Sequence, residues 1–339
     1  MIHLRIVVPS YQAEHVLDLL ENMPGVCNLI FLPGTARRPE GDVILCDVAR
    51  EVASVIVSDL RELDVDTEGS IAIEKIDSTI STAVKQAERA AQGSAGDAVV
   101  WEEVESRTSE NTELSGIFIA FMVLACLIAS VGILLDSPIL IVGAMIVGPE
   151  FGPIAGFCVA AVQRRRDVAR RSFIALAVGF PVGITAAFLF SLLIRAVDLT
   201  PSGFVVSEHP LTDFISHPDA FSFIVAAFAG TAGVLSLTSA KSGALIGVLV
   251  SVTTIPAAAN IGLAAAYGEW AEWRGALLQL ALNLTAILLA GVTTLYIQRA
   301  VYVKRRRAHL HDTAREVAGL PLGRRRRVGA GYGRPGADG

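Results

Sequence analysis

The sequence contains only four cysteines among 339 residues, and no two of them have CxxC spacing. This number and spacing exclude a disulfide scaffold, so we interpret Cys27, Cys46, Cys126 and Cys158 as small packing residues. The sequence also lacks HExxH, GxSxG and glycine-rich nucleotide-binding motifs, and its apolar segments lack paired carboxylates. We therefore expect no enzyme activity, no cofactor and no bound metal.

Net charge is missing from the middle of the chain. Residues 1–113 hold 21 Asp and Glu against 9 Lys and Arg, residues 114–299 hold 9 of each, and residues 300–339 hold 3 acids against 10 bases. The whole chain is 53% hydrophobic with a mean hydropathy of +0.55, which is too apolar for a soluble protein of this length. The pattern indicates an acidic soluble head, a membrane body and a basic tail. The opening MIHLRIVVPS has no long apolar core, so we expect no signal peptide.

Residues 1–76 are predicted to form a cytoplasmic α+β domain. Alternating apolar residues indicate strands, and 3.6-residue periodicity indicates helices between them. The resulting βαββαβ order is typical of a ferredoxin-like sandwich, a shape that small regulatory ligand-binding modules often have. The fold alone does not establish a function. We expect strands at 3–8, 26–32, 42–48 and 70–76, a turn-rich segment at 33–39, and helices at 12–22 and 51–63.

The two polar segments that flank the membrane body have different expected structures. Residues 77–113 are predicted to form a helical linker that is interrupted at Gly93–Gly96. Residues 300–339 are basic and end in a glycine-rich stretch, so we expect a disordered cytoplasmic tail. Basic residues just beyond the last apolar segment suit anionic lipid headgroups better than nucleic acid.

Six apolar segments lie within the predicted transmembrane domain, residues 114–299, and each is near the length of about 20 residues that a spanning helix needs. Basic residues follow the second, fourth and sixth segments, at Arg164–Arg171, Lys241 and Lys304–Arg307. The positive-inside rule then predicts a bacterial inner-membrane protein with both termini in the cytoplasm. The acidic loop 196–219 would lie outside, and we interpret its two histidines as solvated rather than metal-binding. The segments are 114–135, 138–162, 172–194, 220–237, 243–267 and 275–297.

The second apolar segment is unusual for a plain membrane anchor. Pro149 and Pro153 each remove a backbone donor, and Glu150 lies between them near mid-span. Small residues at Ala144, Gly148, Gly152, Gly156 and Ala160 leave one helix face almost without side chains. We predict a broken or tightly packed helix that lines a path. Simple helix packing and a structural role for Glu150 are the alternatives.

A dry bilayer strongly disfavours the charged form of Glu150, which leaves two hypotheses for this side chain. It is either a neutral, hydrogen-bonded acid or a carboxylate that faces a wet cavity or a bound cation. The neighbouring prolines and glycines free backbone carbonyls that need polar partners, which favours the cavity.

The second and fifth segments are the middle members of two possible three-segment repeats. Gly143–Ile146 reads GAMI, Gly243–Ile246 reads GALI, and both segments carry mid-span prolines. Because three crossings are an odd number, two such repeats would be inverted in the membrane. Interrupted segments at matching places in inverted repeats indicate the central site of a transporter. The candidates for a substrate or ion path are Gly148, Pro149, Glu150, Gly152, Pro153, Pro256, Asn260 and Asn283.

Two long runs also resemble a known family. GAMIVGPEFGPIAG and GALIGVLVSVTTIPAAANIGLAAAYG, with the last segment around Asn283, are similar to the bacterial membrane proteins catalogued as domain of unknown function 389. The resemblance covers about residues 114–297 and implies a six-span inner-membrane protein, with no named substrate or catalytic residue. This chain has Glu150-Phe151 after Gly148-Pro149, whereas the family more often has Ser-Pro-Leu-Met before Gly-Pro. It also has one proline, Pro256, where the family often has two.

These features favour a gradient-driven transporter or channel-like carrier of a small solute or ion, regulated by the cytoplasmic domain. The alternative is a non-transporting membrane sensor or scaffold whose soluble domain binds a small ligand or a protein. Partners are then the lipid bilayer and a small solute or ion, without nucleic acid. A homo-oligomer is expected from helix-packing glycines, although packing within one chain is the alternative. These glycines are Gly156, Gly179, Gly183, Gly243 and Gly247.

Overall fold

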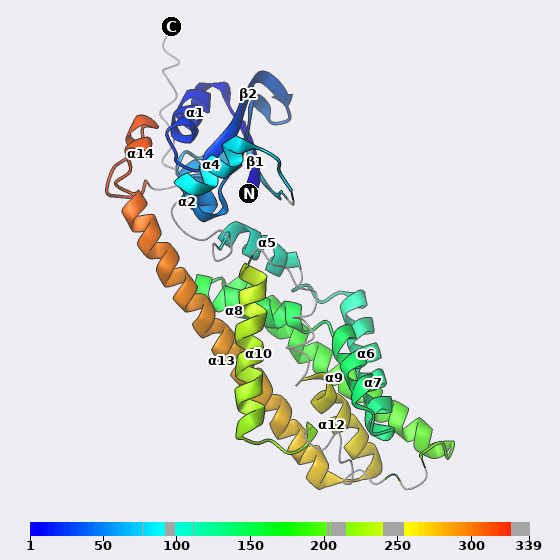
Figure 1. The fold of residues 1–339 in the computed structure, drawn as a ribbon. Coiled ribbons are helices and arrows are strands. Elements are labelled where there is room, and N and C mark those ends of the chain that lie inside the picture. The colour runs from blue at the N-terminus through cyan, green and yellow to red at the C-terminus, as the bar shows by residue number, and fades with distance from the viewer. Residues whose placement is uncertain are drawn as a thin grey trace. The chain divides into compact units, whose positions relative to one another are not determined.

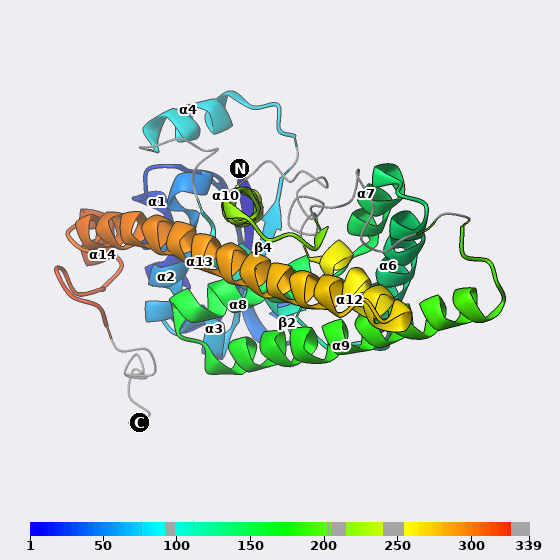
Figure 2. The ribbon, with the colours of Figure 1, turned by 90° about the horizontal axis from the view of Figure 1, so that it is seen from below.

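The computed structural model describes residues 1–76, 78–91, 99–110, 112–201, 204, 215–239 and 254–326, with only the backbone of 107, 109 and 110. The chain divides into two compact units. The head unit contains the described residues up to Glu103 and from Gln298 onward, with Thr238 and Ser239. The membrane unit contains the other described residues, from Val104 to Ile297. Figures 1 and 2 show the elements of both units.

The head unit contains a four-stranded antiparallel sheet with the order β2-β3-β1-β4. Leu4 and Ile6 of β1 are fully buried in one core cluster with Leu19 of α1 and Ile56 of α2, so both helices cover the same face of the sheet. The element order is therefore βαββαβ, as the sequence predicts. The elements are β1 (Ile2–Val8), η1 (Ser10–Gln12), α1 (Ala13–Glu21), β2 (Val26–Arg37), β3 (Glu40–Val48), α2 (Arg50–Glu62), α3 (Val65–Glu68) and β4 (Ser70–Lys75).

The second strand is predicted to end before the turn-rich segment at 33–39, but most of that segment continues the strand. β2 reaches Arg37, and Arg37 pairs with Glu40 at the start of β3. The register shifts between Leu32 and Ala36, where Gly34 has φ +63°. An irregularity of this kind accommodates proline and glycine without ending the hairpin.

Two helices lie in the segment predicted as a helical linker. α4 (Thr82–Ala90) begins at Ser81, whose side chain accepts a hydrogen bond from the backbone N–H of Val84, and it packs near β2. α5 (Trp101–Glu110) begins in the head unit, where the Trp101 backbone N–H donates to Ser54 Oγ at 3.0 Å. The boundary between the units falls within α5, after Glu103.

The C-terminal segment departs most from its prediction. α13 (Trp270–His309) is one 40-residue helix, and α14 (Thr313–Val317) follows it. Ala314, Ala318 and Leu320 are buried in the same core cluster as β1 and α2. The prediction of a disordered tail is therefore wrong for residues 300–326, and residues 327–339 lie outside the described part. Basic composition was misleading because the two most important arginines are paired inside the head unit.

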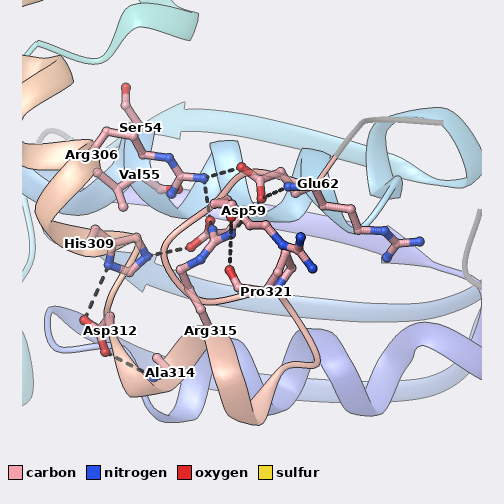
Figure 3. Close-up of polar contacts among 12 residues, drawn as sticks. Ser54, Val55, Asp59, Glu62, Arg306, His309, Asp312, Ala314, Arg315 and Pro321 are labelled. Atoms are coloured by element: carbon pink, nitrogen blue, oxygen red, sulfur yellow. Dashed lines mark hydrogen bonds and ion pairs between the residues drawn. The ribbon is translucent and has the colours of Figure 1, made fainter. Parts of the chain in front are cut away.

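A cluster of charged side chains joins the C-terminal segment to α2 (Figure 3). Arg306 Nη2 lies 2.6 Å from Asp59 Oδ1 and 2.8 Å from Glu62 Oε1. Arg315 contacts the same two carboxylates and donates from Nη2 to Glu62 Oε2 at 2.7 Å. His309 Nε2 lies 2.6 Å from Asp59 Oδ2. Asp59 and both arginines have no exposed surface, so α13 and α14 complete the head through fully desolvated ion pairs.

The same contacts govern how acid affects the head unit. Burial alone raises the pKa of Asp59, but hydrogen bonds from His309 and Arg306 and the charges of both arginines outweigh it and hold this pKa below its ordinary value. A carboxyl with a lower pKa in the folded state contributes stability above its unfolded pKa. That contribution is lost as the pH falls through the folded value.

The membrane unit is helical, and its long apolar helices make the chain a membrane protein. Within the described residues four helices are long and apolar enough to span a bilayer, or five if the bent pair α7 and α8 counts as one span. The predicted six spans are not all established, because α12 has only 13 residues and residues 240–253 lie outside the described part. Besides α13, the helices are α6 (Gly116–Leu134), α7 (Pro138–Val147), α8 (Phe151–Gln163), α9 (Arg166–Ala196), α10 (Ala220–Thr238) and α12 (Ile255–Tyr267).

Two apolar clusters hold these helices together. The larger contains Met122 of α6, Ala144 of α7, Phe180 of α9 and Leu263 of α12, and both figures show α6 and α7 side by side. The smaller joins α8, α10 and α13 through Ile154, Ala226, Ala286 and Ile287. Each half of the broken segment therefore packs in a different cluster, α7 in the larger and α8 in the smaller.

Candidate functional site

The second apolar segment is broken at the residues that the sequence indicated. α7 ends at Val147, α8 begins at Phe151, and the two axes are bent by 55°. Pro149 lies in the break, whereas Pro153 and Gly152 lie in the first turn of α8. Proline removes no intrahelical hydrogen bond in a first turn, so only Pro149 interrupts the helix.

Glu150 lies at the break as the N-cap residue of α8, and its side chain has no exposed surface. Its Oε1 accepts a hydrogen bond of 2.8 Å from the hydroxyl of Thr254, which is the N-cap residue of α12. Gly148 makes room for this carboxyl, because a Cβ at that position would lie 2.5 Å from Glu150 Oε2. Glu150 therefore does not face an open cavity in this conformation, and the hypothesis of a buried, hydrogen-bonded side chain describes it better.

Glu150 also differs in charge from the residues around it in the sequence. It is the only Asp, Glu, Lys, Arg or His in the six predicted apolar segments. No basic side chain within those segments can neutralise it. The starts of α8 and α12, where Glu150 and Thr254 are the N-cap residues, supply a partial positive charge.

The helices on either side of the break recur later in the chain at a constant distance. α6 and α10 both have 19 residues and begin at 116 and 220, and α8 and α12 both have 13 residues and begin at 151 and 255. α9 and α13 begin at 166 and 270. Each pair is offset by 104 residues, and the same offset relates Glu150 to Thr254.

Contacts between the helices follow the same offset. A Cβ on Gly262 of α12 would lie 2.5 Å from the Ile184 carbonyl oxygen and 2.9 Å from Ala187 on α9. Cys158 of α8 precedes Gly262 by 104 residues, and Leu288 of α13 follows Ile184 by 104 residues. These two equivalent positions are also in contact, because Cys158 Sγ lies 3.9 Å from the Leu288 carbonyl oxygen. A Cβ on Gly291 of α13 would lie 2.9 Å from the same sulfur. The short helix of each half thus packs on the long helix of the other half.

The predicted sequence match between the halves used a different register. GAMI at Gly143 and GALI at Gly243 are 100 residues apart, whereas the helices are offset by 104. Four residues correspond to about one helical turn, so a short apolar match cannot distinguish the two registers. Gly243 and Gly247 themselves lie outside the described residues.

The other candidates for the path are buried in the membrane unit but differ in position. Pro256 lies in the first turn of α12 rather than at a mid-span kink. Asn260 of α12 is 4% exposed, and Asn283 of α13 has no exposed surface. Gln279, one turn before Asn283, is also buried. These amides lie on two different helices, and the bond between Glu150 and Thr254 is one of the contacts that join the two halves.

Three of the predicted packing glycines make close contacts within the unit. A Cβ on Gly156 would lie 2.1 Å from Thr112, one on Gly179 would lie 2.8 Å from the Phe118 ring, and one on Gly183 would lie 2.7 Å from Cys126 Sγ. These glycines therefore serve packing within one chain, which was the alternative to packing between subunits. The homo-oligomer remains a prediction without support from these three residues.

Comparison with known proteins identifies the region around the break. Residues 145–289 match the family model described as domain of unknown function (DUF389). These residues form a DUF389 domain. The domain begins just before Glu150, includes Thr254 and ends after Asn283. It therefore contains both members of the buried hydrogen bond and the two short helices that carry them.

One relative extends the comparison beyond the DUF389 domain. An uncharacterised protein of Methanocaldococcus jannaschii is 24% identical over 202 residues, which cover 57% of this chain and 58% of the relative. The matched region therefore spans less than two thirds of the length of that relative. No solved structure matches the chain.

Proposed function

We propose that this protein is a gradient-driven carrier of a small solute or ion in a bacterial inner membrane, with both termini in the cytoplasm. The observation that carries the proposal is the buried hydrogen bond between Glu150 and Thr254 at a broken helix. A glutamate inside a membrane unit is energetically expensive, and such residues characteristically mark ion and substrate pathways. Gradient driving follows because the sequence contains no nucleotide-binding motif.

The proposed body consists of two inverted three-helix repeats. Three pairs of helices begin 104 residues apart, and the exchanged contacts of Cys158 and Gly262 support a two-fold relation between the halves. Glu150 and Thr254 occupy equivalent positions in the two halves, so their mutual bond would lie on the two-fold axis. Discontinuous helices that meet at the interface of inverted repeats are typical of the central site in secondary transporters.

Regulation by the cytoplasmic domain would act through α13. Gln279 and Asn283 belong to the part of this helix in the membrane unit, and Arg306 and His309 belong to the part in the head unit. Because α13 contributes residues to both units, it is the element through which a change in the charged cluster around Asp59 would reach the last span.

The proposal is tested by flux measurements on the full chain in liposomes under imposed ion and pH gradients. Wild-type protein should conduct at least one ion or small solute above the rate of empty liposomes. Glu150→Gln, which keeps shape but removes the ionisable group, should reduce that flux by tenfold or more. Glu113→Gln, an exposed residue just before α6, should retain it. Absence of flux from correctly folded wild-type protein under every gradient would contradict the carrier.

A second candidate function, a membrane sensor, is favoured by a cavity in the head unit. This open cavity of about 670 Å³ lies where the β2–β3 hairpin meets the segment between β1 and α1. Asp42, which is 5% exposed, accepts hydrogen bonds from Ser10 Oγ at 3.0 Å and the Gly34 backbone N–H at 2.7 Å, and it thereby joins two sides of the cavity. The lining residues are Pro9, Ser10, Gly34, Ala36, Arg37, Glu40 and Gly41.

The charges of this cavity suggest a small zwitterion such as an amino acid. Arg37 and Glu40 are directly opposed across the hairpin, so one can bind a carboxylate and the other an ammonium group. We expect a panel of amino acids to include one that raises the melting temperature of the full chain, and Arg37→Gln should abolish the shift. The exposed neighbour Arg38 does not line the cavity, so Arg38→Gln is the control. If Arg37→Gln and Arg38→Gln lose the melting-temperature shift equally, the cavity is not a specific binding site.

A further inference from the structure

We propose that the carrier binds a proton as its coupling ion and that the carboxyl group of Glu150 holds it. This inference rests on the proposed carrier function and adds the identity of the ion. The juxtaposition that leads to it is a single fully buried carboxyl group, hydrogen-bonded to Thr254 at the meeting point of two short helices.

A metal cation fits this site poorly. Magnesium and calcium ions need about six or more oxygen ligands at close range. Glu150 and Thr254 supply two oxygen-bearing side chains, so a metal ion would depend on backbone carbonyls for its other ligands, and the described residues contain no group of three His, Cys, Asp or Glu that could hold one. A proton needs only the carboxyl group itself.

An anion fits poorly as the bound ion for a different reason. The six predicted apolar segments contain no Lys, Arg or His, so no basic side chain in them can attract an anion. The carboxyl group of Glu150 already occupies the place next to Gly148 where the starts of α8 and α12 would favour negative charge. An anion at that place would have to displace this carboxyl group or repel it.

The surroundings of Glu150 can stabilise both of its forms, which a proton carrier requires. Burial away from water favours the neutral acid, whereas the Thr254 hydroxyl and the starts of α8 and α12 favour the carboxylate. The other titratable group that faces Glu150 among the described residues is the Cys126 thiol on α6. Thr254 on α12 and Gly148 before α8 present no titratable group.

The proposed step is a reversible proton transfer. When the site opens to one side of the membrane, the Glu150 O–H bond breaks, water accepts the proton and a carboxylate remains. When the site opens to the other side, the carboxylate takes a proton from water and the O–H bond forms again. The Thr254 hydroxyl can donate to the carboxyl group in both states, so the helices stay joined during the cycle.

Infrared spectroscopy of the full chain in lipid tests proton binding without any transport. Wild-type protein should show the carbonyl stretching band of a protonated carboxylic acid, and this band should disappear as the pH is raised. Glu150→Gln should lack the band, and Glu113→Gln should retain it. A band that persists in Glu150→Gln, or that is absent from wild type at every pH, would overturn the proposal.

Proton flux separates this inference from the carrier itself. A pH-sensitive dye inside the liposomes should report proton uptake by wild type under an imposed potential, and Glu150→Gln should reduce it at least tenfold. If solute or ion flux is independent of the pH gradient and the infrared band is absent, the proposed carrier function stands and the proposed proton binding is overturned. The band without flux of any kind would support proton binding and overturn the carrier.

Discussion

Arg306→Met should lower the free energy of unfolding of the head unit by ~3–5 kcal/mol. The arginine has no exposed surface, and its guanidinium group contacts both Asp59 and Glu62. Methionine fills much of the same volume but removes one of the two buried guanidinium groups, so Asp59 keeps Arg315 and His309, and Glu62 keeps Arg315 and the Arg326 backbone N–H. Because a buried charge without its partner costs far more than the pair contributes, the loss should exceed that of an ordinary surface substitution.

The measurement is chemical or thermal unfolding of the full chain, followed by a signal from the head unit such as Trp101 fluorescence. Arg307→Met is the matched control, because Arg307 is the next residue of the same helix but is exposed. The control should change the free energy of unfolding by less than about 0.5 kcal/mol. Equal effects of the two variants would contradict the role of the cluster. For the same reason, a fragment of residues 1–92 should be less stable than the head unit of the full chain, because it contains Asp59 but lacks Arg306 and Arg315.

Gly262→Ala should destabilise the membrane unit by about 1–3 kcal/mol or more. A Cβ at this position would lie 2.5 Å from the carbonyl oxygen of Ile184 and 2.7 Å from the backbone nitrogen of Phe188. Both are backbone atoms of α9, so no side chain can rotate to make room. α12 would have to move away from α9, and the contact that joins the two halves would weaken.

Thermal unfolding in mild detergent measures this effect. Gly143→Ala is the control, because Gly143 is also helical but a Cβ there would meet nothing within 4 Å. Alanine has the higher helix propensity, so the control should be neutral or slightly stabilised. If Gly262→Ala unfolds at the wild-type temperature, the close approach of α12 and α9 is not a feature of the folded protein.

The two variants address the parts of the structure that were hardest to predict. The tail was expected to be disordered because its residues are basic and rich in glycine, yet Arg306 and Arg315 are buried in the head unit. A basic composition predicts disorder if the charged side chains stay solvated. It does not show whether these side chains pair with carboxylates in a distant part of the chain. The buried acids of α2 were the available signal, since Asp59 and Glu62 lie among apolar residues of a predicted helix.

The order of strands and helices along the head, the apolar segments and the unusual chemistry around Pro149 and Glu150 were evident from the sequence alone, which left a broken or a tightly packed helix open. Each depends on local chemistry: the period of apolar residues, the missing N–H of Pro149 and the small size of Gly148. The tertiary structure decided which residues meet across long distances. Thr254 bonds to Glu150 from 104 residues away, and Arg315 reaches Asp59 from 256 residues away. Periodicity shows which face of a helix is buried, but only the packing of whole helices decides which polar groups meet on that face.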